Sequence, residues 1–67
     1  MAHPSVEEIR FLRLPDVERR VGLKKTTIYR LVKFGMFPAP RKLAGVGNVS
    51  VWPDVEIHQW QRAQMGA

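Results

Sequence analysis

The sequence predicts a small, mainly α-helical domain in which three short helices carry a two-stranded β-hairpin as a wing. Three stretches repeat apolar residues at helical spacing, and glycines follow the first two of them. Between the second and third stretches, apolar and polar residues alternate beside a Gly-Val-Gly-Asn centre, which is typical of a hairpin. The 67 residues suffice for one domain, and so short a chain buries only about 60% of its unfolded surface. A deep catalytic cleft is therefore not expected.

The composition divides the chain into three parts. We expect a flexible N-terminal arm over residues 1–8, a folded domain over residues 9–64 and a short tail over residues 65–67. The arm has no apolar stretch and does not resemble a secretory signal. No apolar run approaches the roughly 20 residues that a membrane span needs. The absence of cysteine excludes disulfides and thiolate zinc sites and fits a reducing cytoplasm.

The first helix is expected over residues 15–21, after an extended apolar segment. Pro15 suits a first helical turn, where its missing N–H group is not needed. Asp16 and Glu18 lie near the positive end of the helix dipole, and two arginines follow near its negative end. One apolar stripe is formed by Leu14, Val17 and Val21. Gly22 then ends the helix.

The second helix is expected to begin near Lys25 and to end by Gly35, and it has two different sides. Its apolar side is formed by Ile28, Leu31 and Val32. A polar, cationic stripe lies roughly 150° away around the helix. The members of this stripe are Thr26, Tyr29, Arg30 and Lys33. We expect the apolar side to pack on the core and the opposite side to be exposed.

The start of this helix departs from the usual pattern. Lys24 and Lys25 stand where Ser, Thr, Asp or Asn is preferred, and loss of such a cap costs about 1 kcal/mol. Their charges also face the positive end of the helix dipole. A phosphate group at this site would be favoured by the backbone N–H groups, the dipole and both ammonium groups. Two solvated lysines are the alternative.

The remainder of the chain is expected to form a bridge, the wing and a third helix. Prolines keep residues 36–40 extended, with Phe37 directed inward. The hairpin follows over residues 41–52, and Pro53 begins the last helix, in which two acids occupy the first turn. The large apolar residues expected in the core here are Trp52, Ile57 and Trp60.

The net charge of +5 is distributed unevenly. No acid lies between Glu18 and Asp54, whereas eight of the eleven cations do. They are Arg19, Arg20, Lys24, Lys25, Arg30, Lys33, Arg41 and Lys42. Such a basic middle indicates a surface that binds a polyanion, and an ordinary solvated face is the alternative.

Two short helices joined by a tight, glycine-containing turn describe a helix-turn-helix, whose second helix enters the DNA major groove. With the hairpin as a wing, the predicted fold is a winged helix-turn-helix. The candidate DNA-binding residues are Lys24, Lys25, Thr26, Thr27, Tyr29, Arg30 and Lys33 on the helix, and Arg41, Lys42 and Asn48 on the wing. Phosphate contacts fix position and base contacts give specificity, and which residues make which contact stays open.

The run FLRLPDVERRVGLKKTTIYRLVKFGMFPAPRKL, followed by VWPDVEIHQW, resembles the AlpA family of small phage and prophage regulators. This family is related to excisionases and to the MerR-like winged helix-turn-helix group. The most specific matches are Gly22-Leu23, Thr27-Ile28-Tyr29-Arg30-Leu31, Gly35, Phe37-Pro38, Trp52 and Trp60. Residues matching Tyr29 and Arg30 approach the DNA backbone in the MerR-like group. Lys24 departs from the family where a serine cap is usual, and so does Val55 before the last helix.

The resemblance implies a cytoplasmic, nucleoid-associated transcriptional regulator of a phage or integrative element, with double-stranded DNA as its partner. One alternative is a recombination directionality factor (an excisionase) that binds and bends attachment-site DNA. Another is a protein-interaction module that contacts a recombinase or polymerase. Self-association on adjacent sites and contact with an integrase or RNA polymerase remain open.

No enzymatic, metal or cofactor site is expected. His3 and His58 have neither a carboxylate nor a second histidine at ligand spacing. RNA binding is disfavoured because the predicted exposed surface has few aromatic residues on which bases stack.

Overall fold

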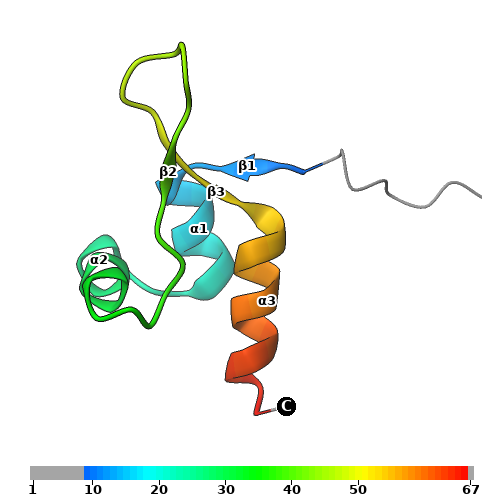
Figure 1. Ribbon diagram of the computed structural model, residues 1–67. Helices are drawn as coiled ribbons and strands as arrows, with labels where there is room; N and C mark the ends of the chain where they lie inside the picture. The colour runs from blue at the N-terminus through cyan, green and yellow to red at the C-terminus, as the bar shows by residue number, and fades with distance from the viewer. Residues whose placement is uncertain (1–8, 67) are drawn as a thin grey trace, which may run out of the picture.

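The computed structural model describes residues 9–66, which form three helices and a three-stranded antiparallel sheet (Figure 1). The elements in chain order are β1 (Phe11–Leu12), α1 (Leu14–Val21), α2 (Lys25–Lys33), β2 (Arg41–Lys42), β3 (Ser50–Pro53) and α3 (Asp54–Gln64). This arrangement confirms the predicted fold class. The expected arm over residues 1–8 lies outside the described residues.

The sheet contains one more strand than the sequence predicted. β3 is central, and its neighbours are β1 on one edge and β2 on the other. In this register Leu12 lies opposite Trp52, and Arg41 lies opposite Val51. The segment before α1 is extended, as expected, but it is also hydrogen-bonded to the strand that follows the wing.

Each of the first two helices ends at a glycine with positive φ. The N–H of Gly22 (φ 74°) donates to the carbonyl oxygen of Glu18 at 2.8 Å, which ends α1. At the end of α2, Gly35 (φ 72°) donates to Val32 and Met36 donates to Leu31, which together form a Schellman motif. Glycine adopts this backbone conformation without the penalty that a Cβ imposes. Both predicted helix stops are therefore confirmed.

The core lies where β3 meets the helices. Its buried cluster takes one residue from each helix, one from β3 and one from the bridge after α2, namely Val17, Ile28, Ile57, Trp52 and Phe37. Consecutive residues Val51, Trp52 and Pro53 are all buried, because β3 is paired on both edges and contacts both α1 and α3. The predicted alternation of buried and exposed residues therefore does not continue through β3.

Two tryptophan side chains attach the bridge to the core. The indole N–H of Trp52 donates to the carbonyl oxygen of Pro38 at 2.8 Å, and that of Trp60 donates to Met36 at 2.8 Å. The Phe37 and Trp60 rings meet edge to face, with their centroids 4.7 Å apart. The predicted inward position of Phe37 is confirmed, while Trp60 is only partly buried.

The third helix is held at both ends by earlier segments of the chain. At its start, the Asp54 N–H donates to the Arg10 carbonyl oxygen at 2.8 Å, and an Asp54 carboxylate oxygen accepts from the Arg10 N–H at 3.2 Å. Further along, the Gln61 side chain donates to the Arg20 carbonyl oxygen at 2.9 Å. Within residues 9–66, no helix combines the length and apolarity that crossing a membrane requires.

Candidate nucleic-acid interface

The two sides of α2 have the environments that the sequence predicted. Ile28 is fully buried, and Leu31 and Val32 pack against the core. On the opposite side, the side chains of Thr26, Tyr29, Arg30 and Lys33 are exposed. Thr27 is half-buried between the two sides and is less accessible than the other candidate residues.

The start of α2 is capped from outside the helix. Lys24 occupies the N-cap with extended backbone (φ −83°, ψ 161°), and its side chain makes no capping hydrogen bond. Instead, a carboxylate oxygen of Glu18 on α1 accepts the N–H of Lys25 at 2.9 Å. The Lys25 N–H therefore has an anionic partner within the protein, and phosphate binding at this position stays a prediction.

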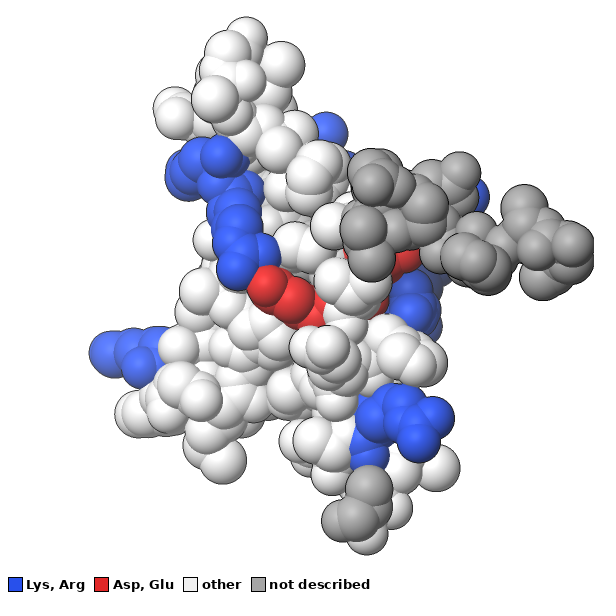
Figure 2. Space-filling model, turned by 45° about the vertical axis from the view of Figure 1, so that its right-hand side comes forward, with Lys and Arg blue, Asp and Glu red and all other residues white. Residues whose placement is uncertain are grey.

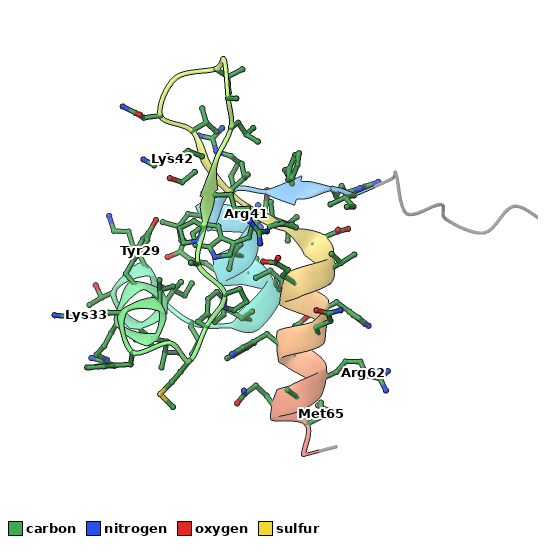
Figure 3. All side chains as sticks on the ribbon, viewed as in Figure 1. Tyr29, Lys33, Arg41, Lys42, Arg62 and Met65 are labelled. Atoms are coloured by element: carbon green, nitrogen blue, oxygen red, sulfur yellow. The ribbon has the colours of Figure 1, made fainter. Side chains whose placement is uncertain are left out.

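Tyr29 belongs partly to the core. Its ring centroid lies 6.1 Å from that of Trp52, at a tilt of 54°, and the residue keeps 39% of its surface exposed. Figure 3 shows Lys33 projecting outward from α2, and Tyr29 at the top of α2, toward the foot of the wing. The Trp52 contact restricts the direction in which Tyr29 can point.

The two cations at the foot of the wing differ in their surroundings. Successive side chains of a strand point to opposite faces. Arg41 forms an ion pair with Glu56 on α3 at 2.7 Å, whereas Lys42 is exposed on the side that also carries Lys33 (Figure 3). Arg41 is therefore partly neutralised.

The tip of the wing is exposed and uncharged. It contains Asn48 together with Gly45 (φ 81°) and Gly47 (φ 79°), and Val46 between them is 54% exposed. Figure 2 shows this tip as a white projection above the cations at its foot. Asn48 is therefore exposed in a loop that carries no charge of its own.

In the folded protein, acidic side chains lie beside several cations of the basic segment between Glu18 and Asp54. Glu18 reaches the start of α2, Glu56 pairs with Arg41, and Asp16 pairs with Arg19. Five cations of α2 and the wing form no ion pair with any of residues 9–66, and we call them the α2–wing surface. They are Lys24, Lys25, Arg30, Lys33 and Lys42.

Two residues of this region were not among the sequence candidates, namely Glu18 and Glu56. For Glu18 a signal existed, because a helix without its own cap that closely follows another helix needs an external hydrogen-bond acceptor. For Glu56 no local signal existed, because its partner Arg41 lies on a different element, beyond the wing.

The chain was compared with known protein families and with known proteins. The model of the family described as Prophage CP4-57 regulatory protein (AlpA) matches residues 10–65. The chain is also similar to the uncharacterized protein ORF88 of Enterobacteria phage P4, with 37% identity over 65 residues, covering 97% of this chain and 72% of that protein. No solved structure matches the chain significantly. The chain belongs to the AlpA family of prophage regulatory proteins.

Proposed function

We propose that the protein is a sequence-selective DNA-binding transcriptional regulator of a phage or integrative element. In this proposal α2 enters the major groove, and the wing over residues 41–52 lies on the flanking backbone. The observation that carries it is the division of α2 between the buried Ile28 and an exposed side with Thr26 and Arg30. Membership of a family of prophage regulators supports the regulatory part of the proposal.

The dimensions of α2 suit this role. Its nine residues make a helix about 13 Å long, which spans about four base pairs, and the major groove is about 12 Å wide. A single module of this kind buries roughly 600–1,000 Å² on DNA, so its discrimination is modest. Adjacent copies on repeated sites would supply additional specificity.

The candidate residues divide by the contacts that they suit. Lys24, Lys25, Lys33 and Lys42 are exposed point charges that suit phosphate groups. Arg30 suits either a bidentate contact with guanine or a phosphate contact. The Tyr29 hydroxyl suits a phosphate oxygen, and the exposed Thr26 suits a base edge or a phosphate.

The first test replaces Arg30. We expect Arg30→Ala to weaken binding to the element's own control region by about 1–3 kcal/mol, which corresponds to about 5- to 150-fold in Kd. Arg62→Ala is the matched control, because Arg62 is exposed in the last turn of α3 and projects away from α2 (Figure 3). Fluorescence anisotropy with a duplex identified by footprinting measures both variants.

The same titrations report the electrostatic contribution. Four to six phosphate contacts predict a log–log slope of affinity against salt concentration of roughly −4 to −5.

If Arg30→Ala and Arg62→Ala weakened binding equally, the assignment of α2 as the reading helix would be rejected.

A protein-interaction module that contacts a recombinase or polymerase is the second candidate. Phe34 and Met36, directly after α2, are 64% and 62% exposed. Met36 also lines an open hollow of about 500 Å³ together with Trp60. Short duplex DNA would not displace a protein bound at this hollow, whereas it would displace a ligand of the α2–wing surface.

A further inference from the structure

Glu18 closes the turn between α1 and α2 at both ends. Its backbone carbonyl oxygen accepts the N–H of Gly22 at 2.8 Å, which ends α1. Its carboxylate accepts the N–H of Lys25 at 2.9 Å, which begins α2. The same residue therefore accepts a hydrogen bond at the end of α1 through its backbone and at the start of α2 through its side chain.

The cap compensates for a residue that cannot perform this role. The first N–H groups of a helix have no partner within the helix, and a lysine ammonium donates hydrogen bonds but accepts none. Lys24 at the N-cap therefore leaves the start of α2 without a local acceptor. A carboxylate is favoured here because it both accepts the bond and faces the positive end of the helix dipole.

The position of Glu18 is itself well determined. The neighbouring Val17 is fully buried in the core, which fixes the rotation of α1 about its own axis. Glu18 is half-buried, so its carboxylate is partly shielded from water. The hydrogen bond to Lys25 thus transmits the orientation of α1 to the start of α2.

The Glu18 carboxylate also affects the charge of the α2–wing surface. It lines a hollow of about 320 Å³ together with Arg19 and Lys24. Arg19 is already paired with Asp16, so without Glu18 the free Lys24 and the N-terminus of α2 would attract any phosphate group, whatever the DNA sequence. With Glu18 present, a phosphate at the Lys25 N–H must displace a carboxylate.

We propose that Glu18 is a positioning residue for the reading helix: it caps α2 from α1 and keeps DNA phosphate groups away from the start of that helix. In this arrangement the side chains of Lys24 and Lys25, and not the backbone N–H groups of α2, contact the DNA phosphates near the start of the helix. The DNA part of the inference rests on the proposed function, whereas the capping part is measurable without DNA.

Two substitutions of Glu18 separate the cap from the charge. Glu18→Ala removes both the acceptor and the charge, and we expect the Tm to fall by about 4–8 °C. Glu18→Gln keeps an acceptor oxygen but loses the charge, so the fall in Tm should be less than half as large. Thermal melting followed by circular dichroism measures both variants.

The effects of the two substitutions on DNA binding should have opposite signs. Glu18→Gln should tighten binding to a footprinted duplex and to a scrambled duplex alike, by about two- to threefold, because one repulsive charge is removed. Glu18→Ala should weaken binding to the footprinted duplex, because the start of α2 is no longer held. The ratio of the affinity for the footprinted duplex to that for the scrambled duplex should therefore fall in Glu18→Ala and stay near the wild-type ratio in Glu18→Gln.

The matched control is Asp16→Asn, which removes one negative charge from the same helix. Asp16 lies about 200° around α1 from Glu18 and pairs with Arg19, so its replacement leaves the cap intact. We expect this variant to change both affinities less than Glu18→Gln does. An equal effect of Asp16→Asn and Glu18→Gln would show that net charge alone is responsible and would overturn the local role.

Other outcomes decide between the parts of the inference. An unchanged Tm in Glu18→Ala would overturn the cap. Equal effects of Glu18→Ala and Glu18→Gln on DNA affinity would overturn positioning. If the wild-type protein bound no duplex while Glu18→Ala still lowered the Tm, the DNA part would fail with the proposed function and the cap would stand.

Discussion

Tyr29 illustrates how one side chain of α2 contributes to both the core and the proposed DNA surface. Its ring packs on Trp52, while 39% of the residue remains exposed. An aromatic contact of this kind contributes about 0.5–1.5 kcal/mol beyond the area that it buries. Ring and hydroxyl should therefore have separable effects on stability and on binding.

We expect Tyr29→Phe to leave stability within about 0.5 kcal/mol of wild type and to weaken DNA binding by about 0.5–1.5 kcal/mol, through loss of one hydrogen bond. Tyr29→Ala should in addition lower the free energy of unfolding by about 1–3 kcal/mol, because the ring contact with Trp52 is lost. Urea denaturation and anisotropy titrations measure the two effects. Wild-type affinity in Tyr29→Phe would mean that the hydroxyl does not contact DNA.

At the same scale, single residues mark the limit of what the sequence predicts. The exposure of Arg30 and Lys33 follows from helical spacing alone. The pairing of Arg41 with Glu56 does not, because it depends on how β2 and α3 meet across the wing. Interactions between residues distant in sequence require the folded arrangement.

At the scale of elements, the turn between α1 and α2 depends on Gly22. Its φ of 74° lies in the left-handed region, and no atom lies within 4 Å of the position that a Cβ would occupy. The cost of a side chain here is therefore conformational and not steric crowding by neighbours.

We expect Gly22→Ala to lower the free energy of unfolding by about 1–2 kcal/mol, the usual cost of this backbone conformation for an L-residue. Gly22→Asn should cost less, because asparagine tolerates the left-handed region better. Chemical denaturation of the two variants provides the comparison. Equal stability of wild type and Gly22→Ala would indicate that the turn adopts another conformation.

The strands were harder to predict than the helices. β1 has two residues, which are too few to show the alternation that marks a strand. Its extended conformation was predicted, but its pairing with β3 follows from the way the chain returns after the wing. The helices were predictable because their caps and apolar stripes are local features.

At the scale of the whole molecule, the core is small and each large residue matters. A domain of 67 residues has an unfolding free energy of roughly 3–10 kcal/mol. Trp52 is fully buried, packs in the central cluster and donates a hydrogen bond to Pro38. Trp60 lies at the edge of the same cluster and is only partly buried.

We therefore expect Trp52→Ala to lower the free energy of unfolding by about 3–5 kcal/mol, a large part of the whole, and to lower the Tm strongly. Trp60→Ala should cost less and leave a folded protein with a lower Tm, since part of its ring is already solvated. Circular dichroism melting curves compare the two variants. A wild-type Tm in Trp52→Ala would show that the core does not depend on this residue.

The sequence by itself determined the three helices, the glycine stops of the first two, the hairpin and the apolar faces of α1 and α2. These features arise from interactions between residues a few positions apart, so their pattern is visible along the chain. The tertiary structure alone decided the pairing of β1 with β3, the cap that Glu18 provides for α2 and the neutralisation of Arg41 by Glu56. The physical reason is that each of these interactions joins different elements, which come together only when the chain folds. Folding pairs the two strands and brings Glu18 and Glu56 beside the basic residues from which the sequence separates them.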